Sequence, residues 1–566
     1  MEEITPELIA SIATRLFREP SQPTSAPLPG FEPPTGMHVP AEVPASVPTH
    51  PTSLPAATSS SLFPGAVQGF KPGSNGLPLP SVPSELPRGF SLPNSLINGP
   101  FGLPSTPSPA VAPPPNDGLR GFVERVQSHE QLKTSGVCTQ DRFLERLRKV
   151  TGPTETKSSY ASRPFDVDAV RRDFPILQQR IHGKPLAWLD NAATTQKPQA
   201  VIDAITNFYT RDNSNIHRAA HTLAARSTDA YEGARQKVQN FLGASSVKEI
   251  VFTRGTTEAI NLAAQTFGKK FLLPGDEIIL STLEHHANIV PWQMIAREKG
   301  AVIRVIPVND RGEVMLGEYE NLLGPRTKLV ALTHASNSLG TVLPITEMSH
   351  MAKRYGARVL IDGAQTVAHL AVNVQEIDCD FFVFSGHKIF SPTGIGVLYG
   401  KEELLDLLPP WQGGGNMIKN VTFEETSYNE PPARFEAGTP SIGDAVGLGA
   451  ALDYVTRLGL PNIAKYEHEL LEYGTEQLSR IGGLRLVGTA REKVGVLSFV
   501  LPGKRTEEVG RLLDLEGIAV RAGHHCSQPS LRRFGLESTV RPSLSIYNTR
   551  EELDRLAEAV RRIQRR

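Results

Sequence analysis

Proline divides the chain into two unlike parts. Of the 46 prolines in 566 residues, 26 lie in the first 116 residues. Proline removes a backbone hydrogen-bond donor and interrupts both helices and sheet ladders. Ser, Gly and Thr fill most of the gaps, so this stretch cannot bury enough apolar surface to offset the entropy cost of ordering it. We therefore predict that residues 1–116 are a disordered extension and that the folded part comes after them.

The start of the extension carries one helical signal. Residues 5–17 (TPELIASIATRLF) begin with a threonine suited to an N-cap and a proline suited to the first turn. An apolar stripe repeats every four residues and consists of Ile4, Leu8, Ile12 and Leu16. Because so short a helix is marginal in water, the stripe indicates a binding partner or packing on the chain's own folded part.

A small aromatic motif recurs further along the extension. A phenylalanine stands beside glycine and proline in PGFEPP (29–34), GFKPG (69–73), RGFSLP (88–93) and GPFGLP (99–104). Spaced aromatic residues in an extended chain can bind several shallow pockets at once through effective concentration. Compositional drift in a linker rich in proline and glycine is the alternative interpretation.

A connector of two short helices is predicted for residues 117–163, which regain charge and helical spacing. The whole chain has 59 basic and 59 acidic residues, which argues against a nucleic-acid partner or a polybasic membrane anchor. No run approaches eighteen apolar residues, and the N-terminus lacks the pattern of a secretory signal. The only cysteines are Cys138, Cys379 and Cys526, so we expect no disulfide framework and a cytoplasmic location.

From about residue 164 onward, apolar strand-like runs alternate with helix-like segments. The runs are IVFTRG (250–255), DEIILST (276–282), AVIRVIPV (301–308), KLVALTHAS (328–336), RVLIDGAQ (358–365) and DFFVFSG (380–386). Continuous apolar strands separated by helices predict a parallel α/β sheet covered on both faces. Functional groups in such sheets gather at the carboxyl ends of the strands.

Two of these strand ends favour binding of a phosphorylated ring. Thr256 and Thr257 follow the first run at a strand-to-helix turn, where free N–H groups suit a phosphate, although threonine there often only caps the helix. Asp362 closes another run, with Gln365 three residues later. A buried carboxylate is costly unless paired, and a cationic ring nitrogen would be a good partner.

Two further strand ends carry reactive or flat side chains. Lys388, in Ser385-Gly386-His387-Lys388, stands at the mouth of a buried strand, where a lysine can form a Schiff base and its neighbours can hold a phosphate. His285, in Glu284-His285-His286, could stack on a flat ring. The two adjacent histidines also suit a metal, but no third and fourth ligand are nearby, so no metal site is expected.

The motifs DNAATT (190–195), GTTEAIN, EHHANIVPWQ, SNSLGT, DGAQ, SGHK, EAGTPS, RAGHHC and RPSLSIYNT follow one another in a specific order. In order and spacing they resemble the SufS-type, or group II, cysteine desulfurases, over about 165–566. The resemblance implies an α/β fold of the fold-type I, class V aminotransferase-like kind, a homodimer and pyridoxal 5'-phosphate. It also implies a large parallel-sheet domain (164–440) and a smaller C-terminal α+β domain (441–566) that carries the nucleophile.

The resemblance implies a role for each matching residue. Cys526 would be the nucleophile, Lys388 the lysine that binds the cofactor covalently, and His285 the stacking residue. The other cofactor ligands would be Thr256, Thr257, Asp362, Gln365, Ser385 and His387, with Thr439 from the other protomer. The substrate would be bound by Asn337, Arg541, Arg521, His217 and Arg218.

The implied reaction converts L-cysteine to L-alanine and leaves a persulfide on Cys526, which a SufE- or SufU-like acceptor would then discharge. A selenocysteine lyase or a class V aminotransferase stays open, although an aminotransferase needs no cysteine at that position. A scaffold that binds proline-rich motifs is the alternative of another class. The extension resembles the cargo-loading domains of desulfurases packaged inside encapsulin shells, so residues 1–116 would bind a shell protein.

Overall fold

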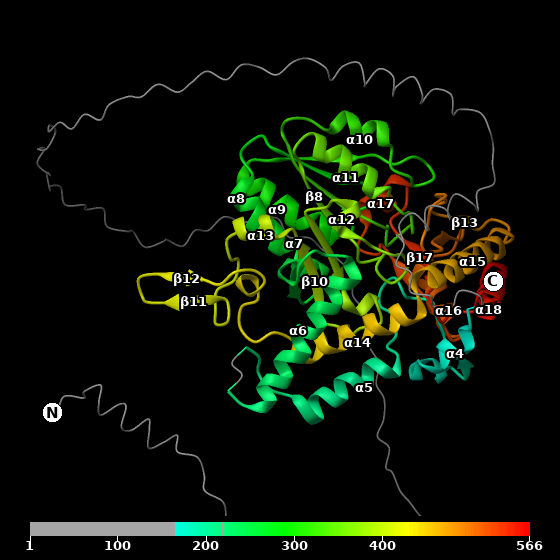
Figure 1. Ribbon diagram of the computed structural model, residues 1–566. Helices are drawn as coiled ribbons and strands as arrows, with labels where there is room; N and C mark the ends of the chain where they lie inside the picture. Colours follow the sequence, from blue (N-terminus) through cyan, green and yellow to red (C-terminus); the bar gives the residue numbers. More distant parts are fainter. Residues whose placement is uncertain (1–164, 218–219) are drawn as a thin grey trace, which may run out of the picture. The chain divides into compact units, whose positions relative to one another are not determined.

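The computed structural model describes residues 165–217 and 220–566 (Figure 1). The predictions made for the extension, its helix at 5–17, the phenylalanine motifs and the connector lie outside these residues, and so does Arg218. Within the described part of the chain, no helix has both the length and the apolar character needed to cross a bilayer.

A seven-stranded sheet forms the centre of the larger part (Figure 1). Its order is β4 (Ile250–Thr253), β10 (Gly396–Gly400), β9 (Phe381–Ser385), β8 (Arg358–Asp362), β7 (Thr327–Thr333), β5 (Glu277–Ser281) and β6 (Val302–Ile306). The strands from β6 to β9 pair in parallel, which confirms the predicted α/β fold. β10, which the sequence pattern did not single out, runs antiparallel to both of its neighbours.

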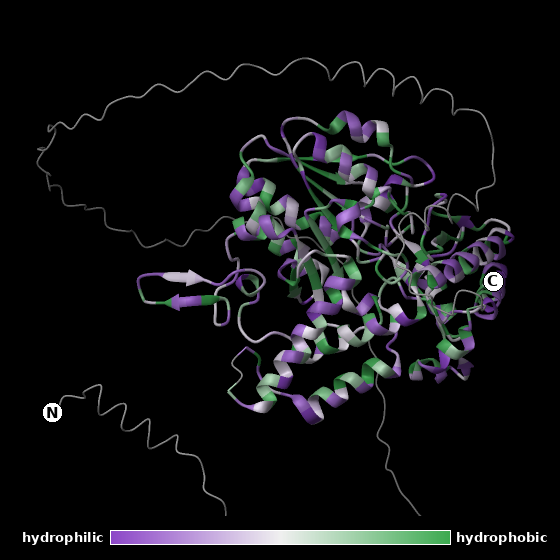
Figure 2. Cartoon of the chain, in the orientation of Figure 1, coloured by the Kyte–Doolittle hydropathy of each residue, from purple (hydrophilic) through white to green (hydrophobic). Residues whose placement is uncertain are grey.

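Helices cover both faces of this sheet because alternate strand residues point to opposite sides. On one face, Ile278 and Leu360 pack with α7 (Thr256–Ala263) and α9 (Val290–Lys299). On the other, Ile279 and Ile361 belong to the core that includes α6 (Thr222–Leu242), α10 (Leu316–Leu322), α11 (Ile345–Arg354) and α14 (Ile442–Leu458). Figure 2 shows hydrophobic strands between helices whose hydrophilic residues face outward.

The C-terminal part has its own antiparallel sheet of β13 (Arg485–Leu486), β14 (Phe499–Val500), β17 (Thr539–Arg541) and β16 (Arg521–Gly523), in that order. A separate apolar core joins this sheet to α15 (Leu460–Ser479), α16 (Thr506–Asp514) and α18 (Arg550–Arg565). The resemblance implied a smaller α+β part over 441–566, but α14, which lies within those bounds, packs in the core of the larger part. β16 leads directly into the segment that carries Cys526.

The remaining elements are short or connect these two parts. They are α4 (Val167–Arg172), β1 (Arg180–Ile181), β2 (Lys184–Pro185), β3 (Ala187–Trp188), α5 (Gln199–Asn207), α8 (Lys269–Phe271), α12 (Val374–Ile377), α13 (Glu402–Leu407), β11 (Ile418–Val421), β12 (Thr426–Tyr428), β15 (Ile518–Ala519) and α17 (Gln528–Arg533). Short helical turns η2 to η8 complete the described part of the chain, including η6 (His286–Asn288) and η7 (Gly386–Lys388). β11 and β12 pair as a hairpin that projects from the rest of the folded part (Figure 1).

Candidate active site

A cavity of about 640 Å³ lies at the carboxyl ends of the central strands. Most of the predicted site residues line it, although they come from both parts of the chain. They are Thr256, Thr257, His285, Asn337, Asp362, Gln365, Ser385, His387, Lys388, Arg521, Cys526 and Arg541. Thr439 and His217 do not line this cavity. The structure thus brings together side chains that lie up to 285 residues apart in the sequence.

One end of the cavity suits a phosphate. The backbone N–H of Thr256, at the start of α7, donates to the Ser385 hydroxyl at 2.8 Å, and the two hydroxyls are also 2.8 Å apart. A Cβ atom placed on Gly396 would lie 2.4 Å from the Cα of Gly255, so β10 can pass this turn only with glycine there. Backbone N–H groups at a helix N-terminus together with hydroxyl groups form a typical anion site.

A carboxyl group, Asp362, and an amine, Lys388, both line this cavity. Asp362 is buried at the end of β8 and accepts a hydrogen bond from the Ala364 N–H at 3.0 Å. Burial raises the pKa of Asp362, and the charge of Lys388 opposes that rise. Burial lowers the pKa of Lys388 to about 8, with Asp362 acting in the other direction. A lysine with this pKa is partly neutral near physiological pH and can react as a nucleophile or take up a proton.

His285 and Gln365 form the walls beside this pair. The Nδ1 atom of His285 accepts from the Ala287 N–H at 3.0 Å. Burial and the nearby Lys388 lower the pKa of His285 to about 3, so the ring is neutral and free to stack on a flat ligand. The amide of Gln365 donates to the carbonyl of Ala192 at 2.7 Å, which fixes its direction at the edge of the cavity.

The segment that carries Cys526 is held in an unusual conformation at the mouth of the cavity. His525 and Cys526 have φ angles of 53° and 54°, in the left-handed region that side-chain-bearing residues rarely adopt. The amide of Asn337 donates to the His525 carbonyl at 2.6 Å and accepts from the Ser527 hydroxyl at 2.6 Å. The His286 N–H donates to the Cys526 carbonyl at 2.8 Å. These bonds hold an exposed thiol in a fixed place.

Two arginines share one carboxylate beside this segment. Arg541 is almost fully buried and donates to the carbonyl of Asn337 at 2.9 Å and to Asp190 at 3.1 Å. Arg521 also binds Asp190, at 3.0 Å. The Nε atom of Arg541 is buried and has no hydrogen-bond partner. That unused donor is what a small carboxylate would need. No role was predicted for Asp190 from the sequence. Its position in the DNAATT motif was the one sign that it could belong to the site.

The predicted residues outside the cavity form a second group. His217 contacts Glu232 at 2.9 Å and Asn416 at 3.1 Å, and Thr439 accepts from the amide of Asn215 at 3.3 Å. The structure therefore does not place His217 and Thr439 around the same cavity as Lys388 within one chain. If His217 and Thr439 contact a ligand, that ligand must lie in the cavity of another copy of the chain.

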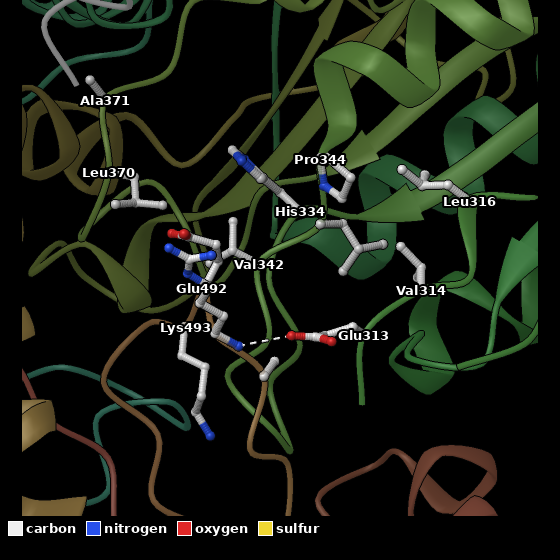
Figure 3. Close-up of a pocket in the computed structure, with 13 residues that line it drawn as sticks. Glu313, Val314, Leu316, His334, Val342, Pro344, Leu370, Ala371, Glu492 and Lys493 are labelled. Atoms are coloured by element: carbon white, nitrogen blue, oxygen red, sulfur yellow. Dashed lines mark hydrogen bonds between the residues drawn. The ribbon is translucent and has the colours of Figure 1, made fainter. Parts of the chain in front are cut away.

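A further cavity of about 510 Å³ contains none of the predicted residues. Figure 3 shows the apolar side chains of Leu316, Val342 and Pro344 around it, with His334 beside them. The Nδ1 atom of His334 is buried without a hydrogen-bond partner, and burial lowers the pKa of this residue to about 4. Its backbone N–H donates to the carbonyl of Asp362 at 2.8 Å. No motif or spacing in the sequence predicted this cavity.

Comparisons with known proteins agree with the fold. The sequence model of the class V aminotransferase family matches residues 187–556. A cysteine desulfurase of Synechococcus elongatus is 54% identical over 560 residues, which cover 99% of this chain and 83% of that protein. A probable cysteine desulfurase of Mycolicibacterium paratuberculosis is 63% identical over 399 residues, which cover 70% of this chain but only 58% of that longer protein.

A solved structure shows the same architecture. The crystal structure of the cysteine desulfurase CsdA from Escherichia coli has a TM-score of 0.66 and 39% sequence identity, and the match covers 71% of this chain and 98% of that one. Fold and cavity together define a pyridoxal-phosphate-dependent enzyme of the fold-type I class. The chain belongs to the class V aminotransferase family and, within it, to the cysteine desulfurases.

Proposed function

We propose that the enzyme takes the sulfur from L-cysteine, leaves it as a persulfide on Cys526 and releases L-alanine. The observation that carries this proposal is the place of the exposed Cys526 thiol, which is fixed at the mouth of the cavity that also contains Lys388 and Asp362. An aminotransferase needs no thiol at this place.

The residues of the cavity fit pyridoxal 5'-phosphate. Asp362 offers a buried carboxylate for the ring nitrogen, and Lys388 offers an amine for the aldehyde carbon. The α7 N-terminus with Ser385 offers donors for the phosphate. When bound, the cofactor supplies an electron sink that draws electron density from the substrate's Cα.

The chain's own groups then account for the remaining steps. The unpaired Nε donor of Arg541 binds the carboxylate of cysteine and orients it. Lys388, as a neutral amine, accepts the Cα proton and later returns a proton to the product. The Cys526 thiolate attacks the substrate sulfur, so that a new S–S bond forms while the C–S bond breaks. The electron pair of that bond stays with the carbon, and protonation of the carbon gives alanine.

The test is to incubate the enzyme with L-cysteine without a thiol acceptor and to analyse both products. We expect one alanine per active site and a mass increase of one sulfur atom on the peptide that contains Cys526. Amino transfer to an oxo acid in place of alanine formation would contradict the proposal and favour an aminotransferase. Turnover with selenocysteine but not with cysteine would favour a selenocysteine lyase.

A matched pair of lysines tests the role of Lys388. Burial lowers the pKa of Lys388 and of Lys493 to about 8, but only Lys388 faces Asp362 in the cavity. Lys388→Ala should lose the visible absorption of the covalently held cofactor, whereas Lys493→Ala should keep it. Equal loss in both variants would contradict the assignment.

Within the family we propose the group II, SufS-like type. The segment between β16 and α17 is short, because Cys526 comes three residues after β16 ends at Gly523 and α17 begins at Gln528. A thiol on so short a connection cannot travel far, so the persulfide must be collected by an acceptor that reaches it, such as a SufE- or SufU-like protein. Sulfide release that rises when such an acceptor is added supports this type.

We also propose that the enzyme works as a homodimer. His217 and Thr439 match the family's binding positions but do not line the cavity of their own chain, which is what residues that serve a partner's site would do. Sedimentation should give twice the mass of one chain. Mixed dimers of Lys388→Ala with Thr439→Ala should regain part of the cofactor affinity that each variant lacks alone.

For the extension we propose a role in packaging, as cargo of an encapsulin shell in the cytoplasm. The similarity to the Synechococcus protein covers 99% of this chain and therefore extends over nearly all of residues 1–116. A chain that starts near Ser158 should keep its turnover but should no longer co-purify with a shell protein. Changing the four motif phenylalanines to alanine should weaken capture stepwise, because multivalent binding fails by degrees (Phe31, Phe70, Phe90 and Phe101). A truncated enzyme that is inactive, or is still packaged, would contradict this role.

A further inference from the structure

A carboxyl group that the proposed reaction does not use lies behind the wall of the cavity. Glu284 precedes His285, but its own side chain is fully buried. Its two oxygens accept hydrogen bonds from the Ser281 hydroxyl at 2.5 Å and from the Asn288 amide at 2.7 Å. Asn288 in turn accepts from the indole N–H of Trp292 at 2.9 Å. We call Ser281, Glu284, Asn288 and Trp292 the Glu284 network.

The network fixes the segment that carries His285. Ser281 is the last residue of β5, Asn288 ends the turn η6, and Trp292 lies fully buried in α9. Glu284 therefore ties the end of a central strand to the helix that covers it, and His285 stands between these anchors. A ring that stacks on a cofactor must be held in this way, because a loosely held side chain pays its ordering entropy at each binding event.

Glu284 is also placed to change its charge near neutral pH. Burial raises its pKa to about 7, and the charge of Asp362 adds to that rise. Hydrogen bonds from Ser281, Asn288 and the Thr333 backbone act in the opposite direction. The groups that donate to Glu284 are all neutral, so no cation fixes its carboxylate in the charged form.

The charged surroundings of Glu284 are few. Asp362 lies at the end of β8, and Lys388 of η7 faces Asp362. The two nearby imidazoles are neutral, since burial lowers the pKa of His285 to about 3 and that of His334 to about 4. Coupling between two sites is reciprocal, so the proton on Glu284 and the charge at Asp362 must affect each other equally.

We propose that Glu284 is a positioning residue for the cofactor: its network holds the His285 wall, and the negative charge it gains on losing its proton strengthens the binding of a cationic ring nitrogen at Asp362. The inference rests on the proposed function only in taking Asp362 and His285 as ligands of pyridoxal phosphate. It adds a second carboxylate that the bound ring never touches, and it predicts a pH-dependent affinity.

The test measures the affinity of the full chain for pyridoxal phosphate at pH 6 and pH 8. It is carried out in the Lys388→Ala background, which removes the titration of that lysine and the covalent bond. Adding Glu284→Gln keeps the size of the side chain but removes its charge. We expect equal affinity at pH 6, where the side chain at position 284 is neutral in both proteins, and a loss of roughly fivefold at pH 8, where only the protein with Glu284 carries the additional negative charge. Titrations of the cofactor itself cancel in this comparison.

Glu249→Gln is the matched control. Glu249 is also a buried glutamate, but it caps the turn before β4 and accepts from the Ser245 N–H at 2.7 Å, at the end of the strand away from the cavity. Its variant should bind the cofactor equally well at both pH values. Should Glu284→Gln weaken binding by the same factor at pH 6 and pH 8, Glu284 would have a structural role alone and the proposal would fail. It would fail equally if affinity did not change.

A second variant serves if Glu284→Gln does not fold. Ser281→Ala removes one donor to the charged form of Glu284, so the pH at which affinity rises should move upward. Infrared titration of the cofactor-free enzyme follows the protonated carboxyl directly, and the band that titrates near neutral pH should shift in the same direction. That readout needs neither cofactor nor sulfur chemistry, so it separates a failure of this inference from a failure of the desulfurase proposal. An unshifted band would overturn the inference.

Discussion

Cys526 and Cys379 are the two cysteines of the described residues, and both stand beside a residue with left-handed backbone. Asp378, with φ of 55°, precedes Cys379, and His525, with φ of 53°, precedes Cys526. Cys379 is fully buried between α12 and β9, and burial raises its pKa far above the usual range. Cys526 is exposed at the mouth of the cavity.

The difference lies in what surrounds each thiol. Cys379 lies in the apolar core, where its thiol donates to the carbonyl of Val374 at 3.9 Å. The segment around Cys526 is instead held by polar groups that leave the sulfur itself open. A thiol becomes a catalytic group when its backbone is fixed and its sulfur is accessible, and a left-handed turn alone does not achieve this.

The largest effect is expected when the two thiols are removed in turn. Cys526→Ser should lower kcat for sulfide release by roughly a thousandfold or more, because the attacking sulfur is gone. Cys379→Ser should leave kcat within about twofold, since its side chain reaches no cavity atom. Sulfide release under reducing conditions measures both. Comparable turnover in the two variants would contradict the assignment of the catalytic role to Cys526 alone.

The rates at which the two thiols are alkylated should differ by a similarly large factor. In a Cys138→Ser background, iodoacetamide should modify Cys526 in the native enzyme. Cys379 should react about a thousandfold more slowly, because it becomes accessible only when the core opens. Mass spectrometry of peptides over time gives both rates, and the difference should vanish in denaturant. Fast native labelling of Cys379 would mean that the core around it opens readily.

A smaller effect is expected when the bonds that hold the Cys526 segment are removed. Asn337→Ala deletes the bonds to His525 and Ser527 and should lower kcat by about tenfold, which corresponds to one or two ordinary hydrogen bonds. Asn337→Asp keeps the acceptor for Ser527 and should lie between this variant and the wild type. Steady-state kinetics should show the loss mainly in kcat. A change confined to KM would instead assign Asn337 to substrate binding, as the sequence suggested.

The smallest effect concerns stability. Cys379→Ala leaves a cavity of about one sulfur atom in a closely packed region and should cost about 1 kcal/mol in the free energy of unfolding. Cys526→Ala, at an exposed position, should cost less. Urea denaturation of both variants measures the difference, and a larger cost at Cys526 would mean that the strained segment depends on its sulfur.

Much of this site was predictable because the carboxyl ends of parallel strands lie at the same edge of the sheet. Asp362 and Lys388 follow strands that the apolar pattern made visible, and parallel strands bring such ends to the same edge of a sheet. The direction of β10 was not predictable, since its short apolar run reads the same in either orientation. Nor was the pairing of Asp190 with Arg541, because a contact across 351 residues leaves no local pattern.

The carboxylate of Asp190, which both arginines share, affects how strongly anions of the buffer inhibit the enzyme. With one anion between Arg521 and Arg541, the mouth of the cavity carries one net positive charge instead of two. Sulfate, chloride and phosphate in the medium are therefore attracted to this mouth less strongly than they would be to two unpaired arginines. Turnover should accordingly vary little with the choice of buffer salt, and an Asp190→Asn enzyme should become sensitive to inhibition by such anions.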